Sequence, residues 1–147
     1  MKDDNLNLKN QLCFPLYAAA RKVTSAYTPI LKPFGLTYTQ YILFLVLWEK
    51  DNIQVSEICE KLFLDSGTVT PLLKKLESKG YLTRHRCECD ERCVYIRLTD
   101  SGKNLKNKLS DVPSKMACCA NLTPQQEQTL SSILYTILNT DKGTPSP

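Results

Sequence analysis

The sequence predicts a mainly α-helical fold with one small β-hairpin, and three observations lead to this prediction. Apolar residues recur at helical spacing through most of the chain. Between residues 81 and 98 that spacing gives way to strand-like composition, in which Val94, Ile96 and Leu98 alternate with more polar neighbours. The 147 residues are 42% hydrophobic and 23% charged, which is typical of a globular domain with its own core.

A long first helix is predicted by apolar residues at helical spacing from Leu16 to Leu31. Pro33 and Gly35 are expected to end it. Pro15 suits the first helical position, where its missing N–H costs nothing. We therefore expect Cys13 to lie just outside the N-terminus of this helix.

Three more helices are expected before residue 81. The second is capped by Thr37 or Thr39 and ends before Asp51, and the third covers about 55–62. The fourth follows a turn at 65–67 and stops at Gly80.

The start of the fourth helix has two possible positions. Asp65 can cap it, with Pro71 slightly bending its second turn. Alternatively Thr70 caps it, and Pro71 is its first residue.

The second half of the chain begins with a hairpin of two strands, Tyr81–Cys87 and Cys93–Leu98, around a charged tip. A fifth helix opens at Thr99 and runs roughly to Val112, where Pro113 breaks the pattern.

A last helix is predicted by Thr123, Pro124 and Gln126, which form a cap, a first-position proline and a capping box. Its apolar stripe, from Leu130 to Leu138, needs a partner in the same chain or in another.

The net charge of +4 is concentrated in one stretch. Residues 72–106 hold nine basic and five acidic side chains, whereas residues 1–71 hold seven of each and residues 107–147 hold three of each. A local basic field favours a polyanionic partner, although a solvated surface with chance clustering would give the same count.

Two helices joined by a tight turn and followed by a basic hairpin form a winged helix-turn-helix, which we expect over Ile53–Thr99. The second helix of such a unit fits the major groove of B-DNA, and an arginine at the wing tip can enter a minor groove. Any single lysine here is better explained as part of the solvated side of an amphipathic helix, but the combined pattern favours double-stranded DNA. The residues expected to form the DNA-binding surface are Ser66, Thr68, Thr70, Lys74, Lys75, Arg84, Arg86, Asp90 and Arg92.

Seven cysteines are many for this length: Cys13, Cys59, Cys87, Cys89, Cys93, Cys118 and Cys119. No signal peptide follows the polar N-terminus, and the longest apolar run, 41–48, is too short to cross a bilayer. We expect a cytoplasmic protein with no membrane partner, whose thiols are reduced and serve in packing, metal binding or redox sensing.

Three stretches resemble the MarR family of repressors: residues 36–48 (LTYTQYILFLVLW), residues 64–76 (LDSGTVTPLLKKL), and the wing sequence Asp90-Glu91-Arg92 with 96–99 (IRLT). The resemblance implies a homodimer of winged heads on pseudo-palindromic DNA, in which Asp90 braces the wing and Arg92 enters the minor groove. It also implies one structural domain in four parts. These are an N-terminal dimerisation helix with the sensing cysteine (1–35), the winged helix-turn-helix (36–99), C-terminal dimerisation helices (100–140) and a flexible tail (141–147).

Residues 10–17 (NQLCFPLY) resemble the organic-hydroperoxide-sensing, OhrR-like branch of that family. The resemblance implies that oxidation of Cys13 releases the repressor from DNA, and that Tyr27 and Tyr38 hydrogen-bond its thiolate, with Tyr17 as a third aromatic residue of that site. It places Cys118 as the resolving cysteine that bonds to Cys13 of the partner subunit. Members with one cysteine instead form a mixed disulfide with a small thiol. Pro15 departs from the pattern of the branch.

From the residues alone, a thiol at a helix N-terminus meets unpaired N–H groups that favour the reactive thiolate. Packing as a small buried apolar residue is the alternative for Cys13. Cys119 remains a second candidate for the resolving thiol.

Other interpretations stay open at this point. His85, Cys87, Cys89 and Cys93 suggest zinc, although they lack a C-x2-C knuckle, so no metal or other cofactor is expected. Oxidation of these wing thiols could also disturb DNA contact directly, and Cys59 is expected to pack in the core.

Two alternative functions also stay open. One is a repressor released by a small aromatic ligand. The other is a thiol peroxidase, which would need a base or a cation such as Arg21 beside Cys13. We expect a regulator rather than an enzyme.

Overall fold

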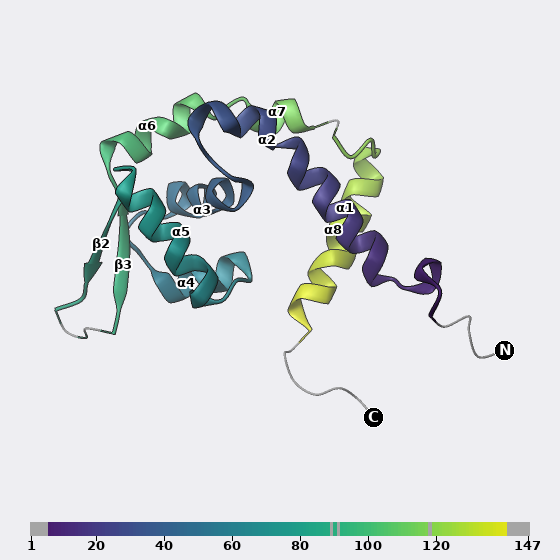
Figure 1. The fold of residues 1–147 in the computed structure, drawn as a ribbon, viewed down its shortest axis with the longest axis horizontal. Coiled ribbons are helices and arrows are strands. Elements are labelled where there is room, and N and C mark those ends of the chain that lie inside the picture. The colour runs from purple at the N-terminus through teal and green to yellow at the C-terminus, as the bar shows by residue number, and fades with distance from the viewer. Residues whose placement is uncertain (1–5, 89, 91, 118, 141–147) are drawn as a thin grey trace. The chain divides into compact units, whose positions relative to one another are not determined.

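The computed structural model describes residues 6–88, 90, 92–117 and 119–140 (Figure 1). The chain divides into two compact units, Met1–Ala117 and Cys118–Pro147. Short 3₁₀ helices lie at Leu8–Asn10 and Lys32–Phe34 of the first unit. The other elements of that unit are α1 (Cys13–Ala26), α2 (Thr28–Leu31), α3 (Tyr38–Glu49), β1 (Ile53–Gln54), α4 (Val55–Leu62), α5 (Ser66–Ser78), β2 (Leu82–Arg86), β3 (Val94–Leu98), α6 (Asp100–Lys108) and α7 (Val112–Met116). The second unit contains α8 (Pro124–Asn139).

The prediction of one long first helix is wrong, because α1 ends at Ala26 and α2 starts afresh at Thr28. Pro29 lies in the first turn of α2 and has no N–H to donate to the carbonyl four residues before it, so the α-helical hydrogen bonding cannot continue. Cys13 is the first residue of α1 and not outside it, which makes Pro15 the third. The expected first position and the observed third position both suit Pro15, since the first N–H groups of a helix have no partner within the helix.

Local capping explains where α3 begins. Thr37, not Thr39, is the cap: its Oγ1 accepts a hydrogen bond from the backbone N–H of Gln40 at 3.3 Å, and the backbone N–H of Thr37 donates to Gln40 Oε1 at 3.1 Å. The helix is apolar around most of its circumference and lies in the core, where Phe44 is fully buried. At its far end, Trp48 donates from Nε1 to the carbonyl of Gly102 at 3.0 Å, which ties α3 to α6.

Asp65 caps α5, which decides between the two starting positions. Its Oδ1 accepts a hydrogen bond from the backbone N–H of Thr68 at 2.8 Å, so Pro71 lies inside the helix. Gly80, at a φ of 76°, provides the left-handed residue that ends the helix and turns the chain into the hairpin.

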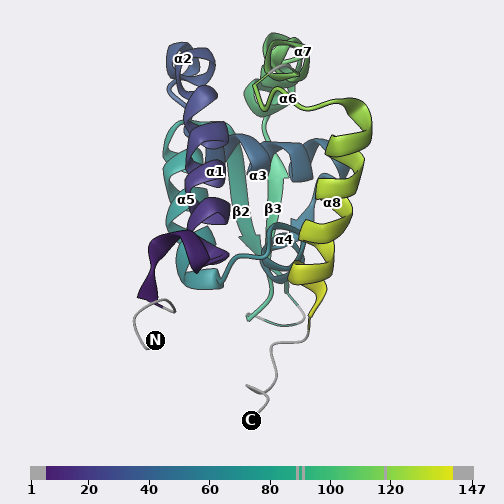
Figure 2. The same cartoon turned by 90° about the vertical axis from the view of Figure 1, so that its right-hand side faces the viewer.

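The sheet has three antiparallel strands in the order β1-β3-β2. The predicted hairpin is present, with Arg84 opposite Ile96, and β2 packs beside α5 (Figures 1 and 2). Strand β1 is not predicted: its Ile53 pairs with Ile96 on the other edge of β3. Two residues carry no readable alternation, so only the pairing reveals this strand. The fold is therefore mainly α-helical with a small antiparallel sheet, as expected.

The core lies between α3, the α4–α5 pair and the inner face of the sheet. Asp51 connects these layers, because its Oδ1 accepts a hydrogen bond from the backbone N–H of Leu98 at 2.8 Å. The core side chains at 0–1% exposure include Leu31, Leu43, Phe44, Leu47, Ile53, Ile58, Val69, Leu73, Leu76, Leu82 and Ile96.

Helix α6 begins at the predicted cap, since Thr99 Oγ1 accepts from the backbone N–H of Gly102 at 3.2 Å. It ends at Lys108, however, short of the expected Val112. Pro113 does not simply break a helix, because it lies in the first turn of α7, where a proline is tolerated.

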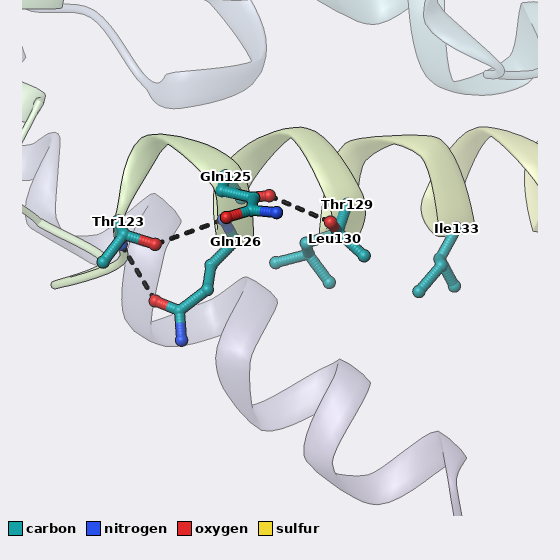
Figure 3. A pocket seen from close by; sticks show the side chains of 6 residues that line it. All are labelled: Thr123, Gln125, Gln126, Thr129, Leu130 and Ile133. Atoms are coloured by element: carbon teal, nitrogen blue, oxygen red, sulfur yellow. Dashed lines mark hydrogen bonds between the residues drawn. The ribbon is translucent and has the colours of Figure 1, made fainter.

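The second unit is built on α8, whose predicted capping box is present. Thr123 and Gln126 exchange backbone-to-side-chain hydrogen bonds of 2.9 and 3.3 Å (Figure 3). Leu130 and Ile133 line a hollow of about 520 Å³ beside this cap. No α8 residue is buried, and Ile133 is 54% exposed, so the other described residues of this unit do not cover the apolar stripe.

In the part of the chain that the structure describes, no single helix has both the length and the apolar composition of a membrane span. Those criteria are met only by a pair, Cys13–Phe34 with Tyr38–Glu49, that is bent by 77°.

Candidate nucleic-acid interface and thiol positions

Helices α4 and α5 present one exposed helical face. Val69, Leu73 and Leu76 are buried on the inner side of α5, so the residues on the opposite side of the helical wheel face outward. Of the residues predicted to face DNA on this helix, Ser66, Thr68, Lys74 and Lys75 are exposed, and Thr70 is half-buried.

The carboxylate of Asp65 fixes the first turn of α5. It accepts hydrogen bonds from the backbone N–H and, at 3.2 Å, from Oγ1 of Thr68. These hydrogen bonds lower the pKa of Asp65, because they stabilise the charged form. The hydroxyl of Thr68 thus serves the cap, and its oxygen lone pairs remain available as acceptors.

An ion pair joins α5 to the wing. Glu77 accepts from the backbone N–H of Arg84 at 2.9 Å and from its Nε at 2.7 Å. Both side chains are about one-third exposed. The Arg84 side-chain hydrogen bond lowers the pKa of Glu77 and outweighs the raising effect of desolvation. Because Nε is engaged, the remaining guanidinium N–H groups of Arg84 are held in a defined direction.

A hollow of about 280 Å³ lies between α4, α5 and the wing. Ser66 and Thr70 of α5 line it together with Arg84 and Arg92 of the hairpin. The structure therefore brings hydroxyl groups of the second helix and wing arginines to one concave surface, although they are up to 26 residues apart in the sequence. Hydroxyl and guanidinium groups on one face can contact bases and phosphates together.

The described part of the wing tip is organised around Asp90. Its Oδ1 accepts from the backbone N–H of Arg92 at 2.9 Å, and its carbonyl accepts from the backbone N–H of Cys93 at 2.9 Å. The Arg92 side chain is exposed at this tip, and Arg86 is exposed further down β2. Asp90 thus closes the turn that carries Arg92.

Cys13 is exposed at the start of α1. Tyr17 lies one helical turn further on and stacks under Arg21, whose Cζ is 5.5 Å from the ring centre. Arg21 is two turns away from Cys13, about 12 Å along the axis. The cation that a peroxidase would need therefore sits on Tyr17, and not beside Cys13.

Tyr27 and Tyr38 form a cluster at the other end of α1. Their ring centres are 4.8 Å apart, and desolvation raises the pKa of Tyr38. Fourteen residues separate Tyr27 from Cys13, which corresponds to about 21 Å along a helix. Within one chain, the structure brings the two tyrosines together and keeps both away from Cys13.

The remaining thiols have separate environments. Cys59 lines the hollow and is half-buried, so it is not the core residue that was expected, and desolvation raises its pKa. Cys119 is half-buried in the second unit. Cys118 and Cys89 lie outside the described residues.

The suggestion of zinc at the wing gains no support. The ring of His85 stacks on Tyr95, with centres 5.8 Å apart. Among the residues described, no three His, Cys, Asp or Glu side chains gather as metal ligands would.

Sequence reasoning missed two residues of this surface, Glu77 and Gln54. Glu77 holds Arg84, and Gln54 Nε2 donates to Cys93 Sγ at 3.2 Å. No local motif marks either residue, because both contacts depend on how the hairpin folds back over the helices.

The helix pair, the three-stranded sheet and the arginine-bearing hairpin define a winged helix-turn-helix, a class of proteins that bind DNA through such a face. The family model for the transcriptional regulator SarA/Rot matches residues 25–109. The chain is 45% identical over 139 residues to the organic hydroperoxide resistance transcriptional regulator of Bacillus subtilis, covering 95% of each protein.

Solved structures of AbfR of Staphylococcus epidermidis are also similar. Reduced AbfR bound to DNA matches with a TM-score of 0.76 and 35% identity, covering 93% of this chain and 96% of the other. AbfR with its disulfide formed matches with a TM-score of 0.66 and 36% identity, covering 95% and 98%. The chain belongs to the MarR family of winged-helix transcriptional regulators, in the group that includes the organic hydroperoxide resistance regulator. Both resemblances seen in the sequence are thereby confirmed, and these relatives are regulators, not enzymes.

Proposed function

We propose that this protein is a DNA-binding repressor that senses organic hydroperoxides through Cys13, and that oxidation releases it from its operator. The observation that carries the proposal is an exposed thiol at the first residue of α1. The surrounding chain is 45% identical to an organic hydroperoxide resistance regulator. We also propose that the protein acts in the cytoplasm, where it regulates transcription from the chromosome.

DNA is read by the concave face of α5 and the wing. The hydroxyl groups of Ser66 and Thr70 and the lysines of α5 meet the major groove and its phosphates, and Arg92 enters the adjacent minor groove. Arg84, held by Glu77, lines the same surface.

The regulator acts as a homodimer. Among the described residues, neither α1 nor α8 contains a buried side chain, and the apolar side chains of Phe14, Leu16 and Ile133 are 40–54% exposed. Apolar faces of this length are normally covered by a partner, and two winged heads would bind the two halves of a pseudo-palindrome. The domain organisation follows, with dimerisation elements in 1–35 and 100–140 around the DNA-binding region 36–99.

The dimer also supplies the groups that Cys13 lacks in its own chain. Because Tyr27 and Tyr38 lie about 21 Å along α1 from Cys13, hydrogen bonds to its thiolate come from the partner's Tyr27 and the partner's Tyr38. Tyr17 of the same helix flanks the thiol one turn away.

The oxidation of Cys13 takes place in two steps. The Cys13 thiolate attacks the outer oxygen of the hydroperoxide, the O–O bond breaks, and the alcohol leaves with a proton. The resulting sulfenic acid is attacked by a second thiol, an S–S bond forms and water leaves. Cys118 of the partner subunit is the proposed second thiol, with Cys119 and a low-molecular-weight thiol as the alternatives.

The test combines a DNA-shift assay with a non-reducing gel after cumene hydroperoxide. Wild type should leave its operator and run as a cross-linked dimer, and Cys13→Ser should do neither. Cys118→Ser should lose the cross-link, Cys119→Ser should keep it, and Cys59→Ser serves as the matched control for loss of a thiol. Release of Cys13→Ser by hydroperoxide would contradict the sensing role. Release by a small phenol without oxidant would favour a ligand-controlled repressor.

A further inference from the structure

We propose that Cys87 and Cys93 are a second oxidation site, which closes a reversible disulfide across the wing and weakens DNA binding independently of Cys13. The pair lies at the base of the tip that carries Arg92. The proposed function uses neither thiol.

The register of the hairpin places the two cysteines opposite each other. Arg86 pairs with Val94, and the next step of the ladder pairs Cys87 with Cys93, whose backbones are joined by a hydrogen bond from Cys87 N to Cys93 O of 2.9 Å. Opposed residues of a hydrogen-bonded antiparallel pair have Cα atoms about 5.5 Å apart, with side chains on the same face. Disulfides need Cα atoms about 4.4–6.8 Å apart, so a bond requires little backbone movement.

Electrostatics also couple the two thiols. Besides desolvation and the Asp90 carboxylate, the charge of Cys87 raises the pKa of Cys93. In the proposed scheme, Cys87 makes the first attack and Cys93 is the resolving thiol.

The chemistry uses an organic hydroperoxide, the oxidant class of the proposed function. Cys87 sulfur takes the outer peroxide oxygen, the O–O bond breaks, and an alcohol leaves. Cys93 sulfur then attacks the sulfenic acid, the S–S bond forms, and water leaves with the displaced oxygen. A dithiol reductant reverses the bond by exchange.

Bond formation has a direct consequence for the wing tip. In the reduced protein, Cys93 Sγ accepts from Gln54 Nε2 at 3.2 Å and lies 3.8 Å from Asp90 Oδ2. Drawing Sγ toward Cys87 removes both contacts. Asp90 also fixes the backbone of Arg92. When Asp90 loses its contact with Cys93 Sγ, its carboxylate shifts and the arginine is redirected.

The experiment uses the full chain with Cys13, Cys118 and Cys119 all changed to Ser, so that the proposed sensor is absent. After cumene hydroperoxide, peptide mapping should find the Cys87–Cys93 disulfide. DNA affinity should fall about tenfold, the scale of one lost groove contact, and dithiothreitol should restore it. In this background, Cys87→Ser or Cys93→Ser should abolish both effects, and Cys89→Ser and Cys59→Ser should leave both in place.

Mapping of the disulfide does not depend on DNA binding, so a failure here is distinguishable from a failure of the proposed function. No disulfide, or one made through Cys89, would overturn the inference. A Cys87–Cys93 disulfide without loss of affinity would overturn it as well.

Discussion

Glu77 of α5 and Arg84 of β2 are joined by two hydrogen bonds, one to the Arg84 backbone and one to its side chain. This relationship fixes the angle between the second helix and the wing, because one carboxylate bridges both elements. The geometry of the DNA-facing hollow therefore depends on a residue that need not contact DNA.

Glu77→Gln tests that bridge through its pH dependence. The Glu77 pKa is lowered from its ordinary 4.5 in the folded protein, so its stabilisation is fully present above about pH 4.5 and is lost as pH falls through the folded value. The variant should be about 1 kcal/mol less stable at pH 7, and the difference should shrink below pH 4.5. Urea titrations between pH 3 and pH 7 measure this. An equal effect of Glu57→Gln, which alters the exposed Lys50 pair, would argue against a special role for the bridge.

Arg92→Ala tests the wing contact. Because the Arg92 side chain is exposed at the tip and Asp90 holds its backbone N–H, the folded head should be unaffected while operator affinity falls about tenfold. The slope of log affinity against log salt should also decrease by about one. Fluorescence anisotropy at several salt concentrations measures both. Lys106→Ala, an exposed charge of the same sign on α6, should change little, and equal effects of the two variants would exclude a specific contact by Arg92.

Gly102→Ala tests the junction between α6 and the hairpin. A Cβ at this position would collide with the carbonyl oxygen of Tyr81 and lie 3.0 Å from Leu98 Cδ2. Since backbone cannot yield as a flexible side chain does, we expect a loss of about 1–3 kcal/mol in the free energy of unfolding. Chemical denaturation measures it, with the exposed neighbour Ser101→Ala as control. A variant as stable as wild type would show that the junction relaxes freely.

Ile133→Asp tests the uncovered stripe of α8. The side chain is exposed within the chain, so the fold should persist while the dimer is destabilised by a charge on its apolar contact. Size-exclusion chromatography should show monomer, and operator affinity should fall by roughly a thousandfold, toward non-specific binding. Ser132→Asp adds the same charge on a neighbouring face and should remain dimeric. Monomeric wild type would contradict the dimer itself.

Much of the fold could be predicted because its signals are local. The caps Thr99 and Thr123 lie within four residues of the groups that they satisfy, and the spacing of apolar residues marks each long helix. The same holds for the face of α5, since the periodicity that buries Leu73 also exposes Lys75. The motifs that indicate the family are likewise contiguous in the sequence.

Tertiary contacts decided the rest. The break between α1 and α2, strand β1, the Glu77–Arg84 bridge and the pairing of Cys87 with Cys93 depend on which segments meet. Sequence periodicity specifies which face of an element is buried, but it does not specify which partner covers that face or in what register. The sequence by itself therefore determined that this chain is a winged-helix regulator with a thiol at the start of its first helix. Only the folded structure decided how the wing is held against α5 and which wing thiols face each other.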